Sequence, residues 1–166
     1  MTKTFFTIWK SPLGRMLLTS NGKALTRLHL ETKKEKILVP QEWIEDEKNF
    51  KSLIKQLDLY FKGKLKKFDI ALLPHGTTFQ QRVWESLCTV PYGTTISYGG
   101  LAKKIHQPTA ARAVGMANNR NPIGIIIPCH RVIGSDGSLV GYGGGLEIKQ
   151  KLLDLEKTGV LPSDFI

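Results

Sequence analysis

The sequence predicts an α+β protein, in which a small N-terminal αβ subdomain with a β-hairpin sheet precedes a mainly helical C-terminal domain with a helix-turn-helix. Three observations indicate this. Strand-like segments surround an Asn-Gly pair within residues 4–30, a Pro-His-Gly break falls at residues 74–76, and two short helical segments separated by a tight turn follow. We therefore expect one subdomain at residues 1–75 and the other at 76–166.

The N-terminal elements follow from local patterns. Residues 4–30 carry strand-type apolar runs on both sides of Asn21-Gly22, a pair typical of a two-residue hairpin turn. Residues 47–62 place apolar side chains at helical spacing, and Gly63 suits the end of that helix. Residues 68–72 predict a last strand before the break.

The C-terminal half begins with Thr77 or Thr78, either of which can cap a helix. Ser97 can cap a second, short helix, and a connector at residues 106–109 precedes a third helix at about residues 110–118. Two short helices across such a turn indicate a helix-turn-helix, although an ordinary αα-corner has the same pattern.

The chain then carries the apolar run 123–127 between two prolines, which predicts a buried strand that ends at Cys129. A glycine-rich segment follows at residues 134–145. It lacks the Gly-Lys-Ser/Thr end of a phosphate-binding P-loop, so we interpret it as a loop. Residues 146–157 predict a final helix with Gly159 after its end.

The charge balance favours a polyanionic partner. The chain has 24 Lys and Arg against 14 Asp and Glu, a net charge of +10, and the stretch from Ser86 to Ser135 contains no acidic residue. A surface that approaches phosphates is expected to lack acidic side chains. A protein with a charged, soluble surface and no polyanionic partner can have the same excess of basic residues. No apolar run is long enough for a membrane span, so we expect no membrane association.

Two cysteines without a secretory signal indicate a reducing compartment, the cytoplasm, or the nucleus in a eukaryote. Cys88 follows an apolar helix face and suits packing. Cys129 is different, because the neighbouring His130 and Arg131 provide cationic surroundings that favour a thiolate. A structural role for Cys129 remains the alternative.

Glu156 falls inside the apolar arc of the final helix, where a carboxylate is costly unless it is paired. Lys149 lies in the same arc and is one candidate partner; His130 is the other. With His130, the chain would hold a nucleophile, a base and an orienting group. The four His and two Cys show no paired ligand spacing, so we expect no metal and no cofactor.

The helix at residues 110–118 favours close approach to a nucleic acid. It is built from small residues, Ala110, Ala111 and Ala113, around one long cation, Arg112. Small side chains let a backbone enter a groove, and a lone Arg there can reach a phosphate, a base edge or the base stack.

The run Ile127-Pro128-Cys129-His130-Arg131-Val132 resembles the active-site motif of the O6-alkylguanine-DNA alkyltransferases. The similarity extends at matching spacings from Phe79 to Glu156, whereas residues 1–74 match only in general layout. It includes Ser97-Tyr98, Ala110 to Gly115, Asn121-Pro122, Gly141-Tyr142, Gly144 to Leu146 and Leu152-Leu153.

The resemblance implies a DNA-repair protein that moves an alkyl group, such as methyl, irreversibly from O6 of guanine, or O4 of thymine, onto Cys129, once per molecule. Its partner would be double-stranded DNA carrying O6-alkylguanine, and we expect a monomer. His130 would be the base, acting through a water, and Glu156 would orient it. Asn121 would tie the helix-turn-helix to the active-site strand, and Tyr98 would lie beside the flipped nucleotide and assist its rotation and the protonation of the leaving guanine.

The resemblance also implies the DNA and base contacts. Arg112 would fill the stack that the base leaves, with Ala110, Ala111, Ala113 and Arg131 as further DNA contacts. Backbone groups of Cys129 and Val132 would read the base edge, and Tyr142, Gly143 and Gly144 would form the pocket wall. Gly143 stands where some relatives carry Ser, and Gly124 where some carry Pro.

Three alternatives stay open. An alkyltransferase-like lesion-binding protein shares the surface but lacks the motif cysteine. A Cys-His hydrolase would need a direct proton transfer that adjacent Cys and His rarely allow. A helix-turn-helix regulator with a structural cysteine would be expected to carry several base-reading side chains on its second helix, where this chain has essentially Arg112.

Overall fold

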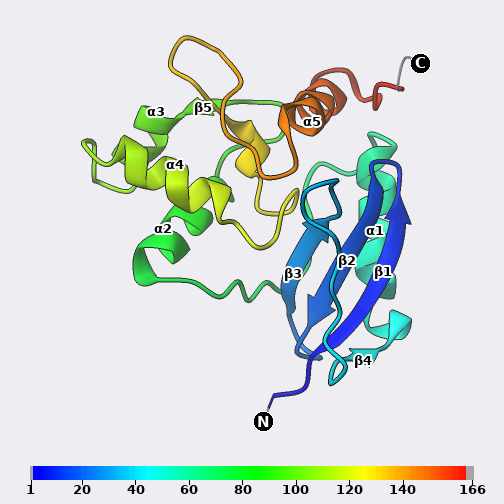
Figure 1. Cartoon of the computed structure of the whole chain (residues 1–166). Helices are drawn as coiled ribbons and strands as arrows, with labels where there is room; N and C mark the ends of the chain where they lie inside the picture. Colours follow the sequence, from blue (N-terminus) through cyan, green and yellow to red (C-terminus); the bar gives the residue numbers. More distant parts are fainter. Residues whose placement is uncertain (1, 164–166) are drawn as a thin grey trace.

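The computed structural model describes residues 2–163. Figure 1 shows the sheet and α1 together on one side and α2, α3 and α4 on the other, with the C-terminal α5 returning toward the sheet. The buried apolar side chains of both sides form one continuous cluster. The predicted α+β class is therefore confirmed, whereas the boundary at residue 75 stays a prediction, because no gap in the core marks it.

The N-terminal sheet has the strand order β3-β2-β1-β4, with β1 antiparallel to β2, β2 antiparallel to β3, and β4 parallel to β1. Its strands are β1 (Phe5–Ser11), β2 (Gly14–Ser20), β3 (Leu25–Leu30) and β4 (Ile44–Glu45). The β2–β3 hairpin at Asn21-Gly22 is present, but its loop spans residues 21–24 rather than two residues. The reason is local: the Asn21 side chain accepts hydrogen bonds from the backbone of Lys23 and Ala24, both at 2.9 Å, which holds a wider turn.

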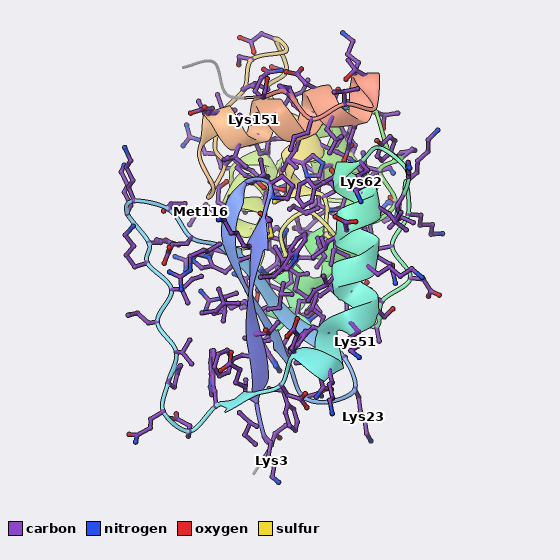
Figure 2. All side chains as sticks on the ribbon, turned by 90° about the vertical axis from the view of Figure 1, so that its right-hand side faces the viewer. Lys3, Lys23, Lys51, Lys62, Met116 and Lys151 are labelled. Atoms are coloured by element: carbon purple, nitrogen blue, oxygen red, sulfur yellow. The ribbon has the colours of Figure 1, made fainter. Side chains whose placement is uncertain are left out.

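One face of the sheet packs on α1 (Lys51–Phe61), which follows a short 3-10 helix, η1 (Glu47–Phe50). Figure 2 shows side chains filling the space between this helix and the strands, while the labelled Lys51 and Lys62 lie on its outer side. The helix ends at Gly63, whose φ of 73° is the left-handed conformation expected there. Residues 68–72 form no strand; a single bridge joins Leu72 to Leu25.

The C-terminal half starts with α2 (Thr78–Leu87), where Thr77 and Gln80 make a reciprocal capping box. Then follow β5 (Ile96–Ser97), α3 (Tyr98–Lys104) capped by Ser97, and α4 (Ala111–Asn119). The turn between α3 and α4 has His106 at φ 61°. The predicted helix-turn-helix is therefore present, and α4 begins one residue later than expected.

The predicted strand at residues 123–127 is wrong. The segment is buried but irregular, with a single bridge from Ile123 to Leu28 on β3. The prolines at 122 and 128 remove two backbone donors from a run of this length, so a ladder cannot extend in either direction. The apolar run marks a core segment, and its period alone did not distinguish a strand from a buried turn.

The chain continues through a second 3-10 helix, η2 (Cys129–Arg131), and β6 (Val132–Ile133), which pairs in parallel with β5. The last helix, α5 (Leu146–Thr158), ends at Gly159 with φ 79°, as its sequence predicts. Within residues 2–163, no helix is both long and apolar enough to cross a membrane.

Candidate active site

Cys129 sits where two tight turns follow one another. The amide of Ile126 donates to the carbonyl of Gly124 at 2.8 Å, and that of Cys129 donates to Ile127 at 2.8 Å. The first turn forces Ile125 to φ 71°, a strained conformation for a β-branched residue that costs on the order of 1–3 kcal/mol. Cys129 is 7% exposed and borders a groove of about 710 Å³. The turns thus hold the thiol at a groove wall.

Two asparagines fix this segment from the helix-turn-helix side. Asn121 donates from Nδ2 to the carbonyl of Ile127 at 2.8 Å and accepts from the amide of Ile123 at 3.0 Å. The predicted tie between α4 and the segment before Cys129 is therefore made by Asn121. Asn118, which the sequence prediction missed, donates from Nδ2 to the carbonyl of Cys129 at 3.3 Å. Its signal was available, because helical spacing places it on the apolar face with Val114.

The carboxylate of Glu156 contacts His130, and not Lys149. Nε2 of His130 lies 2.6 Å from Oε2 of Glu156, and both side chains are fully buried. Lys149 is also buried, but its ammonium donates to the backbone carbonyls of Val132 and Val140. The predicted contact between Glu156 and His130 is confirmed, and the alternative pairing of Glu156 with Lys149 is wrong.

Arg131 does not lie on a DNA-facing surface. Its Nε and Nη2 donate to the two oxygens of Glu156 at 2.8 and 3.0 Å, and its Nη1 donates to the carbonyl of Val90 at 2.7 Å. The predicted DNA contact is therefore contradicted. The fold presents Glu156 within reach of Arg131, and separating such a buried pair would leave an uncompensated charge inside the protein.

The N-terminal half contributes to the same carboxylate. The Tyr60 hydroxyl on α1 donates to Oε2 of Glu156 at 2.6 Å, and the Gly93 amide donates to Oε1 at 3.2 Å. Bonds from His130, Arg131 and Tyr60 hold the pKa of Glu156 far below its usual range, against the opposing effect of burial. Nothing in the sequence indicated Tyr60, because this contact joins distant parts of the chain.

Burial sets the protonation states of the other two groups. It raises the pKa of the Cys129 thiol above its ordinary value of 9.0, and it lowers the pKa of His130 below 6.5. These shifts oppose the expected thiolate, since burial favours the uncharged forms of both the thiol and the imidazole. The neighbouring cation does not lower the pKa of Cys129, because Arg131 is neutralised by Glu156.

The groove wall opposite Cys129 comes from the glycine-rich loop. Tyr142, Gly143 and Gly144 border the groove together with Cys129. Tyr98 donates its hydroxyl to the carbonyl of Val140 on the same loop, at 2.8 Å. The structure therefore places these predicted residues around one site. A side chain at Gly143 would have room, since its Cβ would be 3.9 Å from the Asn119 carbonyl.

Val132, whose backbone is predicted to read the base edge, directly follows η2. It is fully buried and does not border the groove. Its amide donates to the Cys129 carbonyl, and its own carbonyl accepts from Lys149. The Val132 carbonyl accepts one hydrogen bond and can accept a second, so its contact with a base edge stays a prediction.

The predicted DNA-binding residues lie on the outer side of α4. Arg112 and Ala113 are exposed, and Ala110 and Ala111 are partly exposed, whereas Val114 and Ala117 face the core. The structure therefore separates two sets of residues: a buried cluster around Cys129, and a nearly smooth outer helix face from which Arg112 projects.

Fold and site together define a helix-turn-helix protein with a buried cysteine at a groove wall. The family model of the 6-O-methylguanine DNA methyltransferase DNA binding domain matches residues 78–158, and that of its ribonuclease-like domain matches residues 4–74. The methylated-DNA–protein-cysteine methyltransferase of Methanosarcina barkeri is 52% identical over 94% of this chain and 99% of its own length. That of Mycobacterium leprae is 50% identical over 92% of both.

Among solved structures, that of Mycobacterium tuberculosis OGT in complex with DNA superposes with a TM-score of 0.88 at 47% identity, covering 94% of each chain. The chain belongs to the methylated-DNA–protein-cysteine methyltransferase family.

Proposed function

We propose that this protein repairs DNA by direct transfer of an alkyl group from O6 of guanine to Sγ of Cys129. The observation that carries the proposal is the site itself: the Cys129 thiol lies at a groove wall, and the following residue, His130, is held by Glu156 at 2.6 Å. A soft sulfur nucleophile suits attack on the saturated carbon of an alkyl group. The DNA supplies the alkyl group, so the reaction needs no cofactor.

The proton balance follows from this arrangement. The Cys129 thiol gives its proton, through a water, to Nδ1 of His130, which has no partner among the described residues. The S–C bond then forms as the O6–C bond breaks, and the guanine leaves with its electron pair and takes up a proton. The Tyr98 hydroxyl, which contacts the glycine-rich loop at Val140, assists this protonation. Glu156 and Arg131 stabilise the imidazolium formed in between.

Because the product is a thioether, each molecule reacts once. A thioether has no low-energy route back to the thiol, and no other group at the site is suited to cleave it. A Cys-His hydrolase is disfavoured, since it would require an acyl-enzyme and a pair of oxyanion donors.

The lesion in a duplex must be extruded before Cys129 reaches it. The outer face of α4 suits entry into the minor groove, where Ala110, Ala111 and Ala113 permit close approach, and Arg112 occupies the space that the base leaves. The reaction requires a free thiol at Cys129, which supports a reducing compartment such as the cytoplasm; both cysteines are unpaired here.

The test is intact mass spectrometry after mixing with a duplex that carries O6-methylguanine. The expected result is a gain of one methylene per chain, mapped to Cys129, with no further product when the lesion is in excess. Catalytic turnover, or a methyl group on another residue, would overturn the proposal.

A further inference from the structure

The Glu156 carboxylate is reached by more hydrogen-bond donors than it has sites to accept them. Five donors contact it: Nε2 of His130, Nε and Nη2 of Arg131, the Tyr60 hydroxyl and the Gly93 amide. An ionised carboxylate offers about four lone-pair sites on its two oxygens. The donors therefore compete, and a stronger bond from one of them weakens the bonds from the others.

The competition is greatest at Oε2. This oxygen lies 2.6 Å from Nε2 of His130, 2.6 Å from the Tyr60 hydroxyl and 3.0 Å from Nη2 of Arg131. Tyr60 can only donate in this contact, since an ionised carboxylate only accepts. Tyr60 and His130 thus make equally short bonds to one atom, and they come from different halves of the chain, from α1 and η2.

The packing of α1 against α5 fixes the position of the Tyr60 hydroxyl. The Tyr60 side chain is fully buried. One turn later, a Cβ at Gly63 would lie 2.8 Å from the carbonyl carbon of Gly159, so the ends of the two helices meet backbone to backbone. In Figure 2, Lys62 lies at the end of α1 that faces α5. Tyr60 and Glu156 each precede the glycine of their own helix by three residues, so this contact sets the distance between hydroxyl and carboxylate.

The other ionisable groups near His130 and Glu156 define the electrostatic surroundings of the imidazole. Burial lowers the pKa of His130, the bond to Glu156 opposes this, and the charges of Arg131 and Lys149 add to it. Burial also raises the pKa values of the neighbouring phenols and thiol and so favours their uncharged forms: Tyr60, Tyr92, Cys129 and Tyr142. Removing the Tyr60 hydroxyl therefore removes a hydrogen-bond donor and not a charge.

On the basis of the proposed function, we infer that Tyr60 is a positioning residue for the transfer: its hydroxyl occupies Oε2 of Glu156 and so limits the strength of the bond between Glu156 and His130. A stronger bond to the carboxylate at Nε2 stabilises the imidazolium and makes Nδ1 more basic. Nδ1 is the atom that receives the thiol proton in the proposed reaction. The N-terminal half of the chain thus sets how readily His130 takes up that proton.

The first variant is Tyr60→Phe, which leaves four donors for about four acceptor sites. We expect the midpoint of the His130 titration, followed by nitrogen NMR in the unreacted protein, to rise by about one pH unit, the size expected for one hydrogen bond. The acidic limb of the transfer rate against pH should move up equally. At neutral pH the proton on Nε2 should shift downfield, which reports the bond to Glu156 without any titration.

A fluorine ortho to the Tyr60 hydroxyl provides a test of opposite sign, because an electron-withdrawing substituent makes a phenol a stronger donor. A fluorotyrosine at position 60 should lower the His130 midpoint and shift the Nε2 proton upfield. Tyr92→Phe is the matched control. The Tyr92 ring packs on the Arg131 guanidinium at 5.8 Å and contributes no hydrogen bond to Glu156, so both readouts should keep their wild-type values.

A purely structural Tyr60 would give a different result: its loss would lower stability and slow transfer by one factor at every pH, and neither NMR readout would move. Unmoved readouts in both Tyr60 variants, or shifts of the same sign in both, would overturn the inference. Failure of the proposed function is distinguishable, because the wild-type protein would then transfer no methyl group, while the NMR readouts would still respond to Tyr60.

Discussion

Two regions of this protein differ in the exposure of their side chains to solvent: the surroundings of Cys129 and the outer face of α4. Around Cys129, four ionisable side chains lie inside the protein, those of Cys129, His130, Arg131 and Glu156, and Glu156 bonds both His130 and Arg131. On the outer face of α4, small residues and the exposed Arg112 lie in solvent, with Met116 one turn further along at 63% exposure.

The difference follows from what each region must do. Proton transfer and attack require fixed geometry and a medium of low dielectric constant, which burial and the hydrogen bonds of Glu156 provide. Binding to DNA of any sequence requires a smooth surface that can approach a groove and one side chain that can enter it. Substitutions in the first region should therefore change chemistry and stability, and those in the second should change binding and its dependence on the duplex.

The largest expected effect is that of Cys129→Ser. We expect transfer to be lost entirely and affinity for the alkylated duplex to stay within about threefold of wild type, because the affinity resides in phosphate and groove contacts. A binding isotherm measured next to a mass assay checks both. Residual transfer, or lost binding in a folded variant, would contradict the assignment of chemistry to the buried region and of DNA binding to the outer face of α4.

Next is Glu156→Gln, which leaves the buried Arg131 without a carboxylate. We expect a loss of about 3–5 kcal/mol in the free energy of unfolding, measured in urea, together with slower transfer. The low pKa of Glu156 contributes stability above its ordinary value of 4.5 that is lost as the pH falls below it, so the wild-type protein should lose this advantage in acid. Glu147→Gln, exposed on the same helix, is the control and should be neutral.

The pH dependence of transfer tests the protonation states of the buried groups. Because burial lowers the pKa of His130, the imidazole stays neutral down to below pH 6.5, so transfer should be flat around neutrality and fall only at lower pH. Labelling of Cys129 by iodoacetamide should have its midpoint above 9.0. A labelling midpoint near neutrality would show a resting thiolate and contradict this arrangement.

On the exposed region, Arg112→Ala distinguishes a stacking role from a phosphate contact. If Arg112 replaces the flipped base, we expect transfer to fall about tenfold on a matched duplex, less on a mismatched duplex, and least on a single strand. An equal loss on all three substrates would indicate a phosphate contact only. Arg120→Ala, exposed just beyond α4, should weaken binding and lower the salt slope by about one.

The smallest effect concerns Met116. Its position one turn after Arg112 suits an apolar contact in the groove, so Met116→Ala should weaken duplex binding about threefold without changing the salt slope. Leu38→Ala, exposed in the N-terminal half, is the control. Bound duplex should also protect Met116 from peroxide, while the buried Met16 stays unreactive throughout. Equal oxidation of Met116 with and without duplex would place it outside the interface.

Local features were predictable because their causes lie within a few residues. The capping residues Thr77 and Ser97 and the helix ends at Gly63 and Gly159 depend on neighbouring backbone groups. The paired state of Glu156 was predictable too, since helical periodicity placed a carboxylate in an apolar arc, and burial then required a partner.

The sequence by itself determined the α+β class, the helix-turn-helix and the presence of a buried carboxylate. Only the tertiary structure decided which groups share that carboxylate. Tyr60 and Glu156 are 96 residues apart, and Arg131 is 25 residues away, so no periodicity connects them. The same holds for protonation: Arg131 next to Cys129 in sequence suggested a thiolate, but burial of the thiol and pairing of Arg131 with Glu156 reverse that expectation, because desolvation and charge neutralisation depend on the whole surrounding structure.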